Sequence, residues 1–192
     1  SIGYDIRLVE LDSGFLVWSG SAKGERVLET MDLALAQATQ LRAAERQYQA
    51  AVAAQSRRLP VPEIQQRLFD QLDEPHWDEL EQRCLACGNC TAVCPSCFCS
   101  SYHSQPSLDG SSAEHIREWD SCFSFGHSEL HGRPVRVKTG HRYRQWLSHK
   151  LAGWQQQFGR SGCVGCGRCI TWCPVGIDIT EVAAVFSAGE AP

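Results

Sequence analysis

The sequence predicts a mainly α-helical fold in which helices are joined by cysteine-rich turns. Residues 27–57 are rich in Ala, Gln, Leu, Glu and Arg, which are strong helix formers. Apolar residues recur at helical spacing within 141–158, at Tyr143, Trp146, Leu147, Leu151, Trp154 and Phe158. Two cysteine runs of identical spacing each end in Cys-Pro, and proline suits the first turn of a helix because no backbone hydrogen bond is lost there.

Residues 1–73 are expected to form a small β-hairpin followed by helices. Apolar and polar residues alternate after Tyr4, and Asp12-Ser13-Gly14 predicts the turn before the chain returns through Trp18. Residues 27–57 predict one long helix, which either covers the hairpin as a scaffold or serves as an arm that binds a partner. Because the sequence does not begin with methionine, we interpret residues 1–73 as the end of a longer upstream region.

The two cysteine runs carry the chemistry. Both read C-x2-C-x2-C-x3-C-P, the spacing that ligates cubane iron–sulfur clusters in bacterial ferredoxins, where the fourth cysteine ligates the other cluster. Glycines between the cysteines, Gly88, Gly165 and Gly167, allow the backbone to fold close to a cluster. We therefore assign one [4Fe-4S] cluster to Cys84, Cys87, Cys90 and Cys173, and a second to Cys163, Cys166, Cys169 and Cys94.

Helices joined by such turns would make residues 74–192 an α-helical ferredoxin domain with two [4Fe-4S] clusters. Pro75 starts a helix that leads to the first cysteine run, and Gly159 stops the helix of 141–158. Asp178 and Glu181 form a capping pattern that predicts a closing helix. The segment between the two runs is longer than a minimal ferredoxin needs, so we treat residues 100–160 as an insertion.

Two other interpretations of the cysteines remain open. Structural zinc would make the chain a zinc-stabilised assembly module, although zinc sites usually take pairs of cysteines rather than runs of four. A disulfide scaffold is disfavoured because no secretory signal precedes the cysteines. The compartment is therefore expected to be reducing, as the cytoplasm is.

Three cysteines lie outside the two runs: Cys97, Cys99 and Cys122. They could hold a third cluster or a metal ion, completed by a histidine, namely His103, His115, His127 or His131. The spacing matches no standard ligand set, which favours small buried apolar side chains instead. A reductase with an open cluster at Cys122 is a further alternative.

Composition and motifs limit the other functions. The chain has 192 residues, 43% of them hydrophobic, and a net charge of −4, so it is not basic enough to suggest nucleic-acid binding. No apolar run is long enough to span a membrane. No nucleotide fingerprint, nucleophile elbow or H-E-x-x-H site is present, so we assign no catalytic residue of its own. The basic stretch 133–150 could meet an acidic partner or raise the potential of a nearby cluster, and 70–81 could form an acidic docking face.

The chain resembles a known family in residues beyond the eight assigned cluster ligands. It rests on Cys84-Leu85-Ala86-Cys87-Gly88-Asn89-Cys90-Thr91, Cys94-Pro95-Ser96-Cys97-Phe98-Cys99, Trp119-Asp120-Ser121-Cys122, Arg142-Tyr143-Arg144-Gln145, His149-Lys150 and Cys163-Val164-Gly165-Cys166-Gly167-Arg168-Cys169-Ile170. In these residues, over about 75–182, the chain resembles the iron–sulfur beta subunits of cytosolic NAD(P)-linked hydrogenases (sulfhydrogenases) and the A subunits of anaerobic sulfite reductase.

The resemblance implies an electron-transfer subunit that is not itself catalytic. It would relay electrons through two [4Fe-4S] clusters between a flavin subunit that handles NAD(P)H and a catalytic hydrogenase subunit. FAD and NAD(P) would then be bound only by a partner. The same relay role in an anaerobic sulfite reductase, or in a complex like heterodisulfide reductase, is the alternative. Cys97, Cys99 and Cys122 also match positions of the family.

Overall fold

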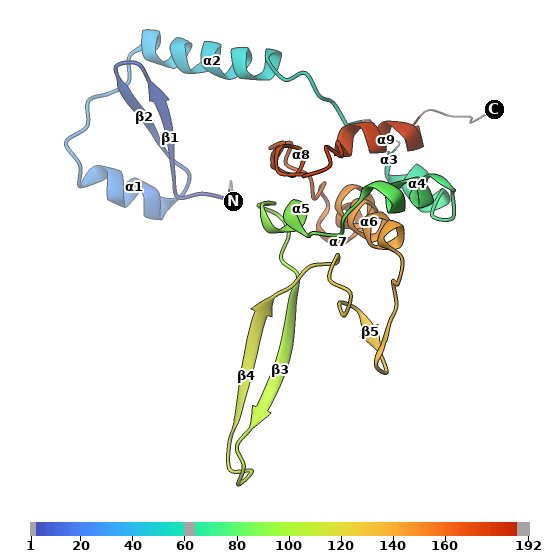
Figure 1. Ribbon diagram of the computed structural model, residues 1–192. Helices are drawn as coiled ribbons and strands as arrows, with labels where there is room; N and C mark the ends of the chain where they lie inside the picture. The colour runs from blue at the N-terminus through green and yellow to red at the C-terminus, as the bar shows by residue number, and fades with distance from the viewer. Residues whose placement is uncertain (1–2, 60–63, 188–192) are drawn as a thin grey trace. The chain divides into compact units, whose positions relative to one another are not determined.

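The computed structural model describes residues 3–59 and 64–187. The chain divides into two compact units, Ser1–Arg58 and Leu59–Pro192 (Figure 1). None of the helices in the described ranges combines the length and the apolar character needed to cross a membrane.

The first unit is built on an antiparallel hairpin. Strands β1 (Ile6–Leu11) and β2 (Gly14–Ser19) pair so that Leu11 faces Gly14 across the turn. The predicted hairpin is thus confirmed. Two helices follow, α1 (Ala22–Glu29) and α2 (Ala38–Ala53), and both contact the hairpin.

The single long helix predicted for 27–57 is wrong, because the chain is not helical between Thr30 and Gln37. The Thr30 hydroxyl donates a hydrogen bond to the carbonyl oxygen of Val27 at 2.7 Å and so satisfies a terminal group of α1. The second helix begins with a capping box of Gln37 and Gln40. These local bonds at the helix ends outweigh the helical propensity of the residues between them.

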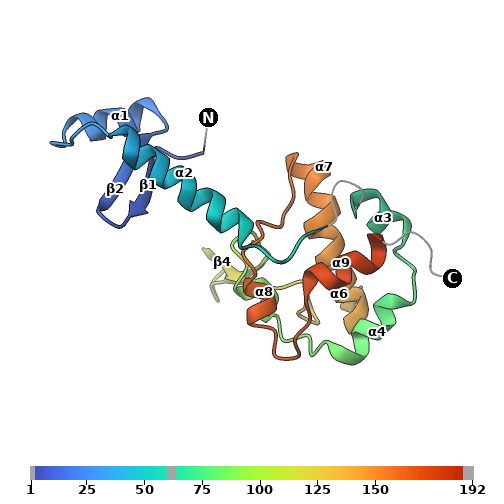
Figure 2. The same cartoon turned by 90° about the horizontal axis from the view of Figure 1, so that it is seen from above.

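The second unit gathers its helices around one core, as Figure 2 shows. Its helices before the insertion are α3 (Ile64–Asp70), α4 (His76–Arg83) and α5 (Asn89–Ala92). After the insertion come α6 (Thr139–Ser148), the π-helical stretch η1 (His149–Gly153), α7 (Trp154–Phe158), α8 (Arg168–Thr171) and α9 (Ile179–Ser187). The expected helices near Pro75, in 141–158 and after Asp178 are therefore present.

Aromatic side chains join α4, α6 and α9 in this core. Trp77 stacks on Phe186 with ring centroids 4.3 Å apart, and its indole N–H donates to the carbonyl oxygen of Gln71 at 2.9 Å. Helix α6 approaches α4 closely at Gly140, where an added Cβ would lie 2.2 Å from the carbonyl oxygen of Trp77. Helix α4, which leads to the first cysteine run, is thus in direct contact with α6, which carries aromatic residues of the core.

The expectation of a mainly α fold is wrong. Helices hold 42% of the described residues and strands 17%, in three two-stranded antiparallel sheets. In the insertion, β3 (Ser100–Pro106) pairs with β4 (Ala113–Trp119), and β5 (Glu129–Leu130) pairs with β6 (Arg133–Pro134). Figure 1 shows the β3–β4 hairpin running away from the helices of its own unit. The Asp109 carboxylate fixes its turn by accepting hydrogen bonds from Ser107 and Ser111.

Candidate metal centre

Both cysteine runs fold into the same local structure. Gly88 precedes α5 with φ 76°, and Gly167 precedes α8 with φ 70°, a left-handed conformation that glycine adopts without strain. Helices α5 and α8 contact one another, and the Asn89 side chain donates to the carbonyl oxygen of Trp172 at 3.2 Å. The two turns are therefore neighbours that belong to different ends of the domain.

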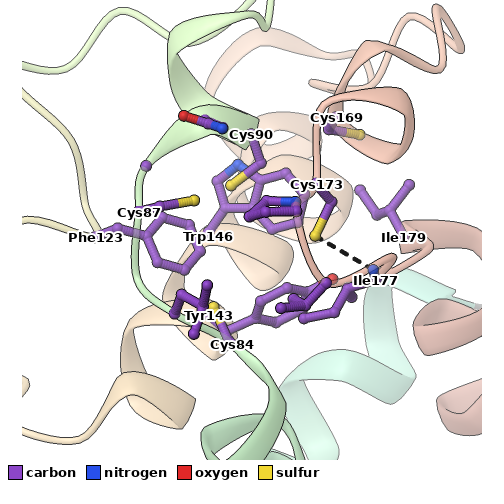
Figure 3. A pocket seen from close by; sticks show the side chains of 15 residues that line it. Cys84, Cys87, Cys90, Phe123, Tyr143, Trp146, Cys169, Cys173, Ile177 and Ile179 are labelled. Carbon is purple, nitrogen blue, oxygen red and sulfur yellow. Dashed lines mark hydrogen bonds between the residues drawn. The ribbon is translucent and has the colours of Figure 1, made fainter.

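The first assigned ligand set borders one cavity. Cys84, Cys87 and Cys90 from the first run line it together with two cysteines of the second run, Cys173 and Cys169, although Cys169 is assigned to the other set. Figure 3 shows the sulfur atoms of Cys87, Cys90 and Cys173 directed toward the same space. The wall of the cavity is mostly apolar and includes Phe123, Tyr143, Trp146, Ile177 and Ile179.

The thiols of this cavity have an environment that suits a metal. Burial raises the pKa of Cys84 and, more strongly, the pKa of Cys90, and neighbouring cysteines add to the effect. A thiolate at these positions therefore needs a positive partner, which bound iron would supply. The backbone N–H of Ile177 donates to Cys173 Sγ at 3.3 Å, a contact typical of cluster ligands.

The second assigned set is also brought together. Burial, with smaller contributions from Cys163, Cys94 and Cys166, raises the pKa of Cys169 to about 11. Cys94, from the first run, is thus within electrostatic reach of Cys169 in the second run. Cys87 of the first set and Cys166 of the second are exposed, and the remaining six assigned cysteines are partly buried.

Polar groups surround Cys94. The Lys150 ammonium lies 3.2 Å from Cys94 Sγ, and it also donates to Ser96 Oγ at 3.0 Å and to the carbonyl oxygen of Gly162 at 3.3 Å. A hydrogen bond from Cys97 lowers the pKa of Cys94 to about 4 against the effect of burial, and Ser96 and Lys150 contribute. These contacts favour the thiolate form of Cys94.

The structure buries three residues of the segments that were predicted to form docking surfaces. Arg142 and Lys150 were expected on a docking surface, but both are buried, with Lys150 only 4% exposed. Trp77, expected on the acidic face, lies in the core. The spacing of Arg142 and Lys150 indicates their burial, because each lies four residues from the buried Trp146 on the same helical stripe.

The three extra cysteines gather beside the two sets. A hydrogen bond with Cys122 lowers the pKa of Cys99 to about 6 and raises the pKa of Cys122. Cys97 contacts Cys94, as described above. Within residues 3–59 and 64–187, no three Cys, His, Asp or Glu side chains converge as they would around a single metal ion, and this includes the eight assigned ligands.

Comparison with known proteins agrees with this geometry. Residues 83–177 match the family model of the 4Fe-4S dicluster domain. This stretch belongs to that iron–sulfur family. The chain is also 33% identical to sulfhydrogenase 2 subunit beta of Pyrococcus furiosus, over 94% of its own length.

The resemblance to hydrogenase beta subunits is thereby confirmed, and the chain is an iron–sulfur homologue of such a subunit. The match covers 54% of the Pyrococcus protein, so the chain spans about half of that relative's length. No solved structure was found to match the chain.

Proposed function

We propose that this chain is an electron-transfer subunit that carries two [4Fe-4S] clusters. It is supported most by the mixed origin of the cysteines at each site. Cys173 lines the cavity of the first run, and Cys94 is within electrostatic reach of Cys169 of the second. In dicluster ferredoxins this exchange gives each cluster a ligand from the other motif, which keeps the clusters close enough to pass electrons.

The residues have distinct roles in this relay. Cys84, Cys87, Cys90 and Cys173 would hold one cluster, and Cys163, Cys166, Cys169 and Cys94 the other. The clusters supply one-electron redox chemistry when bound. Tyr143 and Trp146 exclude water from the first site, and the N–H of Ile177 and the Lys150 ammonium stabilise negative charge on the ligand sulfurs.

The name of the relative, a subunit beta, supports membership of a complex with several subunits. We propose a flavin subunit that oxidises or reduces NAD(P)H on one side and a catalytic subunit of the hydrogenase type on the other. The eleven free cysteines are consistent with work in a reducing compartment, for which we propose the cytoplasm.

Anaerobic purification followed by metal analysis tests the proposal. We expect both iron and acid-labile sulfide, at least about eight of each for the two assigned clusters, and a low-potential electron paramagnetic resonance (EPR) signal after reduction by NAD(P)H with the flavin partner. Stoichiometric zinc without sulfide would instead support the assembly-module alternative. Clusters that the flavin partner cannot reduce would contradict the relay.

A further inference from the structure

The fold brings together the three cysteines that lie outside the two runs. Cys97 and Cys99 precede β3, whereas Cys122 follows β4. Cys99 and Cys122 lie close enough to shift each other's pKa, and Cys122 is also within electrostatic reach of Cys97 and of the assigned ligand Cys90. Three thiols from two segments thus meet beside the first cluster site.

Hydrogen bonds fix both segments in place. The N–H of Asp120 donates to the carbonyl oxygen of Cys99 at 3.0 Å and closes the base of the β3–β4 hairpin. The Ser121 hydroxyl lies 2.7 Å from the Thr91 hydroxyl of α5 and accepts the N–H of Phe123 at 3.1 Å. Cys122 is therefore anchored to the first cysteine run, and its position does not depend on a loose loop.

A second, more open cavity lies next to these thiols. Cys97 and Cys99 line it together with the exposed ligand Cys87, and the rest of its wall includes Trp119, Asp120 and Ser124. Thiols that served only as apolar filling would be enclosed in the core. Here all three are partly exposed, and two face a cavity with polar groups in its wall.

Positive charge is available at the same place. The Lys150 ammonium donates to Cys94 Sγ, and it lies close enough to Cys97 for that thiol to raise its pKa. His127 and His149 lie within electrostatic reach of Cys99, and the ring nitrogen Nδ1 of His127 is 2.9 Å from a carboxylate oxygen of Asp120. The Lys150 ammonium would offset part of the negative charge that three thiolates bring to one site.

We propose that Cys97, Cys99 and Cys122 ligate a third iron–sulfur cluster next to the cluster of Cys84, Cys87 and Cys90. A single metal ion is not proposed, because the three sulfurs do not converge on one point. The inference rests on the proposed function in one respect, since the neighbouring reduced cluster would be the electron donor. One electron then passes from that cluster to the third, with no bond broken and no proton moved.

Iron analysis of the full chain, purified anaerobically, tests the third cluster. We expect about 11 or 12 iron atoms per chain, compared with about eight for two clusters alone. The triple variant Cys97→Ser, Cys99→Ser, Cys122→Ser should lose three or four iron atoms and one EPR signal while the other signals persist. Ser124→Ala changes the wall of the same cavity without removing a thiol and should keep the full iron content.

Each contrary result is distinct. About eight iron atoms in the wild-type chain, with or without a Cys99–Cys122 disulfide, would overturn the third cluster even if the triple variant failed to fold. An unchanged iron content in a folded triple variant would overturn it as well. Loss of the motif clusters themselves would be a failure of the proposed function, which the EPR signals of those clusters report separately.

Discussion

The Lys150 ammonium lies 3.2 Å from Cys94 Sγ in a position that is only 4% exposed. No carboxylate lies within ion-pair distance of it in the described part of the chain, so thiolates are its nearest negative groups. Burial alone would lower the pKa of Lys150, but Cys97 and Cys94 outweigh this and raise it. The side chain is therefore charged at neutral pH and lies beside the proposed second cluster site.

Replacing Lys150 by methionine should lower the midpoint potential of the cluster held by Cys163, Cys166, Cys169 and Cys94. A positive charge stabilises the reduced, more negative cluster, so its removal favours the oxidised form. We expect a shift of roughly 60 mV, the equivalent of about 1.4 kcal/mol for a one-electron couple. An EPR-monitored redox titration measures it.

Lys150→Arg is the matched control, because it keeps the charge and should keep most of the potential. The other cluster should titrate at an unchanged potential in both variants. Equal shifts of both clusters, or no shift in Lys150→Met, would contradict the assignment of Lys150 to the second site.

Exchange of ligands between the runs predicts which cluster each cysteine supports. Cys94→Ser should damage the cluster of Cys163, Cys166 and Cys169, although that cluster is remote in sequence. Cys173→Ser should damage the cluster of Cys84, Cys87 and Cys90. EPR spectra of the two variants should therefore lack different signals. Loss of the cluster nearer in sequence in each variant would refute the crossed assignment.

The two turns differ at one equivalent position. Ala86 has φ 52°, whereas its counterpart Gly165 has φ 70°. The left-handed region costs a residue with a Cβ about 1 kcal/mol relative to glycine. Ala86→Gly should therefore stabilise the first turn, and Gly165→Ala should weaken the second, each by about 1 kcal/mol.

Resistance of the clusters to an iron chelator, followed by their visible absorption, measures both effects. Because no described residue other than its chain neighbours has an atom within 4 Å of the Cβ that Gly165→Ala would add, the expected loss comes from the backbone alone. A faster loss of clusters in Ala86→Gly than in the wild type would contradict this explanation.

Local signals in the sequence predicted part of the structure, and contacts between distant segments decided the rest. The first hairpin was predictable because Asp12-Ser13-Gly14 interrupts an alternating pattern. The β3–β4 hairpin was missed because its strands bury neither face, and Tyr102 is 69% exposed. Without a buried face, the pattern of alternation is absent.

The candidate site, like the fold, could be predicted from the sequence only in part. The cysteine spacing is local and fixes each turn, so both runs could be recognised from the sequence. The role of Lys150 depends on Ser96 and Gly162, residues that only the fold brings to it. The charge of a lysine predicts that it is exposed. Only its position on an apolar helical stripe indicates that it is buried.

Gly140 links the core to the first cluster site. A Cβ at this position would lie 2.2 Å from the carbonyl oxygen of Trp77, and backbone cannot move aside as a flexible side chain can. Gly140→Ala should therefore force α6 away from α4 and lower the free energy of unfolding by about 1–3 kcal/mol. Helix α4 leads directly to Cys84, and α6 carries Tyr143 and Trp146 of the cavity wall, so this variant should also lose its first cluster faster in a chelator.

Gly153→Ala is the control, because the nearest neighbour of its added Cβ is the His149 side chain at 3.3 Å, which can shift. Denaturant unfolding of the anaerobic protein compares the two variants, and equal stability of both would show that the close approach at Gly140 does not hold the helices together.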